Sequence, residues 1–140
     1  MEIQPDIQIT EEQLYIYGNR QGLRRVIQNV IKNGLDHGEK KISIVLEHNQ
    51  NQSVLRITNQ VTHPKQIDID HVFERFYKAD MARSKTSSGL GLSIARELVS
   101  RMNGKIEARI EKEEFIVEMK FLTITKVSSH AENYADRLLY

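Results

Sequence analysis

The sequence has no cysteine, little net charge and no long apolar run. Without cysteine, a disulfide framework and thiolate metal sites are excluded. The net charge of +1 gives no overall electrostatic case for binding nucleic acid or an anionic membrane. No apolar run reaches about 18 residues, so we expect no transmembrane helix. The first residues lack the basic and apolar regions of a signal peptide, which favours an intracellular domain.

The remaining composition is that of an ordinary globular protein, with 39% hydrophobic and 28% charged residues. A chain of 140 residues fits one domain around a single core. Strand-like alternation begins almost at the first residue. We therefore expect the chain to be a piece of a larger protein.

Apolar periodicity predicts two amphipathic helices. The first covers residues 20–36, with Gly38 as its stop, and the second covers residues 90–102, ended by Asn103-Gly104. Between and around them, alternation predicts six strands. These strands are expected at residues 3–9, 14–17, 40–47, 53–59, 105–110 and 115–122.

The last four of these strands form two hairpins, which implies mostly antiparallel pairing. Residues 73–77 read as a short helical turn, residues 79–88 as a mobile loop, and residues 128–140 as a short amphipathic helix. The order of elements predicts an α+β fold, a two-layer sandwich in which the helices cover one sheet face. We expect one domain over residues 1–124 and a separate tail over residues 125–140.

Two asparagines on the first helix are candidates for metal chemistry. Asn29 and Asn33 are four residues apart, so they lie on one helical face beside the apolar stripe. Carboxamide oxygens are hard ligands that suit a Mg²⁺ ion which keeps waters and phosphate oxygens. The alternative is that both are ordinary residues at the boundary of the buried face.

A glycine pair precedes the second helix, in the sequence Ser87-Ser88-Gly89-Leu90-Gly91. A helix N-terminus offers unpaired N–H groups and a positive dipole end, which suit a phosphate, and glycines let the backbone approach a ligand closely. The alternative is a flexible loop-to-helix junction without a ligand. A single Gly-x-Gly does not decide between the two.

Asn59 is the last residue of the predicted strand 53–59, the second strand of the first hairpin. A carboxamide at this position could form paired hydrogen bonds with the edge of a purine. The alternative is an asparagine that begins a turn, which is a common role at the end of a strand.

The order and spacing of these motifs resemble the catalytic ATP-binding domain of sensor histidine kinases, in the GHKL ATPase superfamily. NVIKNGLDHG (29–38) is similar to the N box of that family, and HVFERFYKAD (71–80) to its F box. SGLGLSIARELVSRMNGKI (88–106) is similar to the G2 box with the helix and strand after it. The resemblance spans residues 14–122.

In that family ATP lies between the N-box helix and a mobile lid, and Mg²⁺ bridges the phosphates. The resemblance implies that Asn33 coordinates Mg²⁺, that Asn29 supports the metal and the phosphates, and that Phe73 and Phe76 anchor the base of the lid. The residues it places at the nucleotide are Asn29, Asn33, Asp36, His37, Asn59, Val61, Arg75, Phe76, Lys78, Ser88, Gly89, Leu90, Gly91 and Leu92.

For Arg75 and Lys78 the alternative of solvated surface charge stays open. Leu92 is expected to begin the packing of the helix on the sheet.

The sequence departs from the family where Asp-x-Gly-x-Gly is usual, since Asn59-Gln60-Val61-Thr62-His63 stands there. Asn59 can still accept from the adenine amino group and donate to N1, through neutral hydrogen bonds. Asp36 stands where a basic residue is common, and His37 where Tyr is common.

The resemblance implies transfer of the γ-phosphoryl group of ATP to a His outside this chain, because none of the five histidines lies in a dimerisation helix pair: His37, His48, His63, His71 and His130. It implies the catalytic module of a larger sensor kinase, with a phosphoacceptor domain and a response regulator as partners. The parent protein is expected to be a homodimer anchored in the bacterial cell membrane, with this domain in the cytoplasm.

Two alternatives remain at this stage. One is a degenerate nucleotide-binding or protein-interaction module without kinase activity, which the Asn59 region suggests. The other is a different GHKL member, such as an anti-sigma-factor type Ser kinase. The combination of FERFYK with SGLGLSIA favours the sensor family over the latter.

Overall fold

The computed structural model describes residues 5–37, 41–77 and 90–124. Gly38, the expected loop at residues 79–88 and the tail from residue 125 lie outside the described residues. In chain order the elements are β1 (Asp6–Ile9), α1 (Arg20–His37), β2 (Ile42–Asn49), β3 (Gln52–Gln60), two 3₁₀ helices (Pro64–Gln66 and Ile69–His71), α2 (Gly91–Arg101), β4 (Lys105–Glu111) and β5 (Glu114–Leu122).

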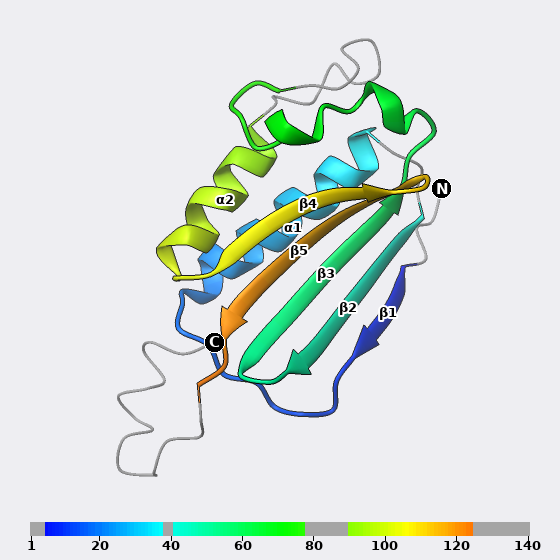
Figure 1. Ribbon diagram of the computed structural model, residues 1–140. Coiled ribbons are helices and arrows are strands. Elements are labelled where there is room, and N and C mark those ends of the chain that lie inside the picture. The colour runs from blue at the N-terminus through cyan, green and yellow to red at the C-terminus, as the bar shows by residue number, and fades with distance from the viewer. Residues whose placement is uncertain (1–4, 38–40, 78–89, 125–140) are drawn as a thin grey trace, which may run out of the picture.

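The strands form one mixed sheet with the order β1-β2-β3-β5-β4. β1 is parallel to β2, and the other neighbours are antiparallel. Both helices lie on the same face of this sheet (Figure 1). The two-layer α+β prediction is therefore confirmed, together with both hairpins and both helices.

The core lies between the helices and the sheet. Alternate residues of β3 and β5 point to the helix side, where Ile57, Val117 and Met119 meet Val26 of α1 and Val99 of α2. Each of these side chains is almost fully buried. This packing holds α1 against α2.

Side-chain and backbone hydrogen bonds fix the ends of the helices. Asn19 caps α1, because its Oδ1 accepts a hydrogen bond of 3.0 Å from the backbone N–H of Gly22. After α2, Asn103 adopts a left-handed conformation with φ 57°, and Gly104 donates to the carbonyl of Val99 at 3.0 Å. Neither described helix is apolar and long enough to cross a membrane.

The strand predicted at residues 14–17 is wrong. This segment contributes a single bridge at Tyr17, and the carbonyl of Tyr15 accepts one hydrogen bond from the N–H of Ile124 at 2.7 Å. Ile16 is buried in the core while its neighbours are more exposed. The alternation of apolar residues at 14–17 therefore reflects the burial of Ile16, and this segment does not pair as a strand of the sheet.

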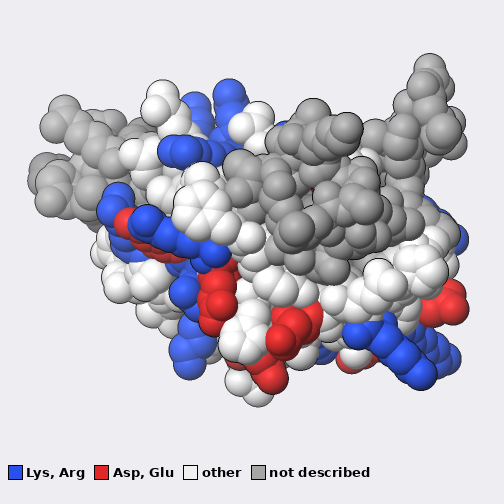
Figure 2. Space-filling model, turned by 90° about the horizontal axis from the view of Figure 1, so that it is seen from above, with Lys and Arg blue, Asp and Glu red and all other residues white. Residues whose placement is uncertain are grey.

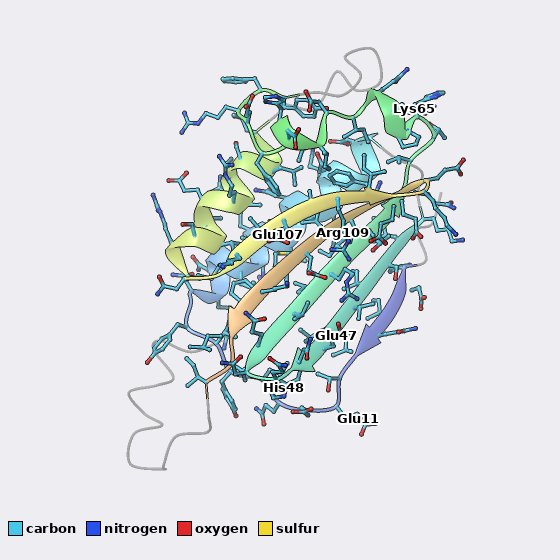
Figure 3. All side chains as sticks on the ribbon, in the orientation of Figure 1. Glu11, Glu47, His48, Lys65, Glu107 and Arg109 are labelled. Carbon is cyan, nitrogen blue, oxygen red and sulfur yellow. The ribbon has the colours of Figure 1, made fainter. Side chains whose placement is uncertain are left out.

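A charged network covers the sheet face opposite the helices, where Figure 3 labels Glu47 and Arg109. Arg56 donates to Glu118 at 2.9 Å and to Glu47 at 2.7 Å. The Glu118 side chain is 9% exposed. Its burial acts to raise its pKa, but the hydrogen bond from Arg56 and the charges of Arg109, Arg56 and Lys120 outweigh burial and lower the pKa.

Candidate functional site

The polar face of α1 carries Asn29 and Asn33, which are both half-buried. The Nδ2 atom of Asn29 is buried and has no hydrogen-bond partner within the described part of the chain. A buried donor without a partner costs about 1–3 kcal/mol, so native proteins keep such groups rarely and often for function. This atom marks the polar face of α1 as a candidate ligand site.

The beginning of α2 lies directly beside Asn29. Gly91 is the first residue of α2, and a β-carbon on Gly91 would lie 3.6 Å from the Asn29 carbonyl oxygen. Leu90 precedes the helix, and within the described residues no side chain forms a cap hydrogen bond at the start of α2. The start of α2 therefore packs against Asn29, whose side-chain donor has no partner among the described residues, and a helix N-terminus suits an anion.

Asn59 at the end of β3 packs against the same helix, one residue beyond Asn33. Its side chain is buried, and its Nδ2 donates to the carbonyl of Gln60 at 3.3 Å and to that of Gly34 at 3.5 Å. The structure thus brings Asn59 against α1 at Gly34, the residue after Asn33.

Asp36 has a cationic partner on its own helix. The Nζ of Lys32 lies 2.8 Å from Asp36 Oδ2, and the two side chains are 61% and 20% exposed. Around the axis of an ideal helix, Asp36 lies close to Asn29. Lys32 lies further from Asn29, on the solvent side. The carboxylate that stands in the N-box segment is therefore neutralised by an i,i+4 pair.

The F-box segment forms hydrogen-bonded turns, as expected for residues 73–77. Phe73 and Arg75 line a groove of about 440 Å³ along the outer side of α2, where the guanidinium of Arg96 lies 5.7 Å from the centre of the Phe73 ring. Figure 2 shows Lys and Arg side chains gathered on the side of the molecule where α2 lies in Figure 1. Phe76 is 70% exposed and adopts a positive φ of 64°.

His71 at the start of this segment is held by acidic side chains. Its Nδ1 lies 2.6 Å from Oε1 of Glu74, and its Nε2 lies 3.6 Å from Oδ2 of Asp68. The hydrogen bond with Glu74 and then the charge of Asp68 raise the pKa of His71 above its ordinary value of 6.5.

The other candidates divide into core residues and residues without a described side chain. Val61 and Leu92 are buried in the core, so they shape the walls of the site through packing. His37 is the last residue of α1. Lys78, Ser88 and Gly89 lie outside the described residues, as does the side chain of His37.

Comparison with known proteins identifies the family. Residues 18–125 match the family described as histidine kinase-, DNA gyrase B-, and HSP90-like ATPase. The chain belongs to this ATPase family. The match covers α1, the start of α2 and the strands between and after them, so it includes every described residue of the candidate site.

Sensor histidine kinases are among the relatives of this ATPase domain. Sensor histidine kinase YcbM of Bacillus subtilis is 28% identical over 127 residues, which are 86% of this chain and 41% of YcbM. Sensor protein DltS of Streptococcus agalactiae is 32% identical over 114 residues, which are 79% of this chain and 29% of DltS. The chain thus spans less than half the length of these two relatives.

Among solved structures, the mycobacterial sensor histidine kinase MprB matches with a TM-score of 0.71 and 23% identity. The match covers 85% of this chain and 84% of the MprB chain. This likeness shows the fold. The ATPase family match and the sequence relatives identify the chain as an ATP-binding catalytic domain of the sensor histidine kinase type.

The described residues fit a nucleotide of this family at its phosphate end. Among the described residues Nδ2 of Asn29 has no acceptor, and α2 begins at Gly91, which packs against Asn29. No group of three or more His, Asp or Glu side chains within the described ranges is arranged to hold a metal ion. The metal donors that this wall offers are the carboxamide oxygens of Asn29 and Asn33, which suit Mg²⁺ with waters and phosphate oxygens as its other ligands.

Sequence reasoning did not identify two residues of this ATPase site, Gly34 and Lys32. The i,i+4 spacing of Lys32 and Asp36 is itself a signal for a helical ion pair. The contact of Gly34 with Asn59 joins residues 25 positions apart. A glycine inside an otherwise regular helix is the only trace of that contact in the sequence.

Proposed function

We propose that this domain binds ATP with Mg²⁺ between the polar face of α1 and the start of α2, and transfers the γ-phosphoryl group to a His on a separate dimerisation domain. The observation that carries the proposal is the buried Nδ2 of Asn29, which has no partner among the described residues and belongs to a residue whose backbone packs against Gly91. A phosphate oxygen is the acceptor that satisfies such a donor at a helix N-terminus. Membership of the ATPase family and the sensor kinase relatives support it.

The residues of the chain act by positioning and by charge neutralisation. Oδ1 of Asn33 would hold Mg²⁺, and Asn29 would support the metal and donate through Nδ2 to a phosphate oxygen. When bound, Mg²⁺ supplies positive charge that offsets the charge of the phosphates. The N–H groups at Gly91 hold the phosphate chain in place, and Asn59 holds the base. Phosphoryl transfer needs this alignment more than it needs a covalent step.

Lys32 offsets the negative charge of Asp36, which would otherwise repel an anionic ligand. A lone carboxylate close to the phosphates repels them. The ion pair of 2.8 Å with Lys32 offsets this repulsion, because the pair carries no net charge. We propose that the pair replaces the basic residue that is common at position 36 in sensor kinases.

The wider role follows the family. We propose that residues 1–124 form the catalytic domain, followed by the tail of residues 125–140. The parent protein would be a membrane-anchored homodimer with this domain in the cytoplasm. Its phosphoacceptor His domain would pass the phosphoryl group to a response regulator in a two-component system, and no nucleic acid would take part.

Titration with a fluorescent ATP analogue, with and without Mg²⁺, tests the proposal. We expect saturable binding that Mg²⁺ strengthens, and transfer of the γ-phosphoryl group to a separately purified dimerisation domain. Asn33→Ala should remove most of the Mg²⁺ dependence, whereas Gln28→Ala, at an exposed position on the same helix, should keep it. The absence of saturable binding at millimolar nucleotide would sink the proposal.

A further inference from the structure

We propose that a groove between the start of α1 and the end of α2 is a docking surface for an acidic polypeptide segment. These two helix ends lie side by side, at the end of the helical layer away from the start of α2 (Figure 1). The groove has a volume of about 500 Å³. No described residue proposed for the nucleotide lines it, so this inference goes beyond the ATP site and does not depend on it.

Two glycines shape the α1 side of the groove. A β-carbon on Gly18 would lie 2.7 Å from Sδ of Met102, so the chain before α1 passes close against the end of α2. A β-carbon on Gly22 would make only ordinary contacts, the nearest at 3.6 Å from Cβ of Asn19. A longer side chain at position 22 would therefore have room, and it would fill the space that a docked side chain would use.

Cations stand on both walls of the groove. Arg25 of α1 and Arg101 of α2 line it, and both are exposed. Within the described ranges no carboxylate pairs with Arg25, whereas Arg101 forms an i,i+4 pair with Glu97 at 2.8 Å. The side chains of that pair are 71% and 54% exposed. Such an exposed pair contributes little, so Arg101 can exchange Glu97 for a carboxylate of a partner with little loss of stability.

The helical layer as a whole is basic. α1 and α2 together contain six Lys and Arg residues but only two Asp and Glu residues, a net charge of +4, whereas the whole chain carries +1. The first turn of α1 has no acidic residue, so no side chain of that turn offsets the positive end of the helix dipole beside the groove. A partner rich in carboxylates complements this field.

The shape of the groove favours a polypeptide over an anionic membrane. A membrane surface is broad and attracts clusters of cations that stand out from a protein. Here the two arginines flank a hollow, to which Leu98 and Met102 contribute apolar side chains. A polypeptide segment can place an apolar side chain in the hollow and a carboxylate at each arginine, as in interfaces with an apolar centre and a polar rim.

Fluorescence anisotropy with the chain of 140 residues tests this docking surface. The probe is a short labelled peptide of Glu and Asp with a central Leu-Phe pair, and the comparison peptide carries Gln and Asn in place of the acidic residues. We expect saturable binding of the acidic peptide below about 1 mM, weakened by salt, and no saturable binding of the neutral peptide. Arg25→Glu should weaken binding about threefold to tenfold, because it reverses a charge at the groove.

Two further variants separate the groove from general charge. Arg24→Glu makes the same change of charge at an exposed neighbouring position that does not line the groove, and it should weaken binding about twofold or less. Gly22→Leu changes no charge but fills the groove, so binding should fall at least about fivefold. Leucine also has the higher helix propensity. If Gly22→Leu does not fold, as judged by circular dichroism, Arg101→Glu on the α2 wall should weaken binding as Arg25→Glu does.

Each contrary outcome overturns the proposal. One is the absence of saturable binding of the acidic peptide at about 1 mM. Another is equal weakening by Arg24→Glu and Arg25→Glu, which would show attraction by general charge. Unchanged binding in a folded Gly22→Leu variant would place the peptide elsewhere. Retention on vesicles that contain phosphatidylserine, lost in Arg25→Glu and without binding of the peptide, would assign the surface to a membrane. No nucleotide is present in these titrations, so their result is independent of the proposed function.

Discussion

Gly91 of α2 lies against Asn29 of α1, since a β-carbon on Gly91 would be 3.6 Å from the Asn29 carbonyl oxygen. This contact joins two segments that are more than sixty positions apart in the sequence. It places the start of one helix against the residue of the other whose Nδ2 is buried and has no partner among the described residues. The donors proposed for the phosphates thus exist as a group only after the helices have packed.

Asn29→Leu should stabilise the protein and abolish nucleotide binding. The substitution removes a buried donor that has no partner, so the free energy of unfolding should rise by about 1 kcal/mol. Because the same donor is proposed to hold a phosphate, affinity for Mg-ATP should fall at least about tenfold. Denaturant unfolding and nucleotide titration check the two effects. A variant that is less stable and still binds ATP would contradict the role of Asn29.

Removing either charge of the Lys32–Asp36 pair should change the affinity for ATP. Lys32→Gln leaves the carboxylate uncompensated, so affinity for ATP should fall about threefold to tenfold at low salt, with a smaller effect at high salt. Asp36→Asn should raise affinity, because Lys32 then keeps its full charge for the ligand. Stability should change by about 0.5 kcal/mol or less in both, since the pair is surface-exposed.

Arg24→Gln serves as the control for this pair, because Arg24 is an exposed basic residue earlier on the same helix. It removes the same charge as Lys32→Gln. Equal losses of affinity in the two variants would show that net charge, and no local pair, governs binding.

Glu74→Gln should lower the pKa of His71. The hydrogen bond with Glu74 is the largest cause of the raised pKa, followed by the charge of Asp68. A raised pKa in the folded state stabilises the fold below the unfolded pKa, and this contribution is lost as the pH rises through the folded pKa. NMR titration should give His71 a pKa above 6.5 in wild type. An unchanged pKa in Glu74→Gln would exclude Glu74 as the cause.

Glu118→Gln should weaken the charged network and reduce the sensitivity of stability to acid. The pKa of Glu118 is lowered, so its contribution is present above its ordinary value of 4.5 and is lost as the pH falls through the folded pKa. At pH 7 the variant should lose about 1–2 kcal/mol, because Arg56 loses a partner that is almost buried.

Glu107→Gln is the matched control for Glu118→Gln. Glu107 faces Glu118 across the β4–β5 pair and is exposed. Its replacement should change the free energy of unfolding by about 0.5 kcal/mol or less. Equal losses in the two variants, measured by urea unfolding between pH 3 and pH 7, would contradict the central place of Glu118 in the network.

Much of the fold can be predicted from local pattern. The stripe along α1, the stop at Asn103-Gly104 and the two hairpins depend on periodicity and turn residues, which are local properties. The segment 14–17 shows the limit, because burial of Ile16 produces the same alternation as a strand. The parallel pairing of β1 with β2 was not predicted, because it joins strands separated by the whole of α1.

The site was predictable as a set of residue types and less so as an arrangement. Asn29 and Asn33 share a helical face, which the sequence predicts from their spacing. The engagement of Asn59 Nδ2 by the carbonyl of Gly34 depends on how β3 approaches α1, and no local rule contains it. The lack of a hydrogen-bond partner for Asn29 Nδ2 among the described residues also depends on packing. It can be recognised only when every neighbouring residue has been placed.

The side-chain amide of Asn29 gives the most direct test of ATP binding at this site. Its ¹⁵N–¹H signals are followed by NMR while a non-hydrolysable ATP analogue is added with Mg²⁺. We predict that both amide protons shift on saturation and that one exchanges more slowly with solvent, because Nδ2 gains a phosphate acceptor. Saturable binding that leaves these signals unchanged would contradict the account.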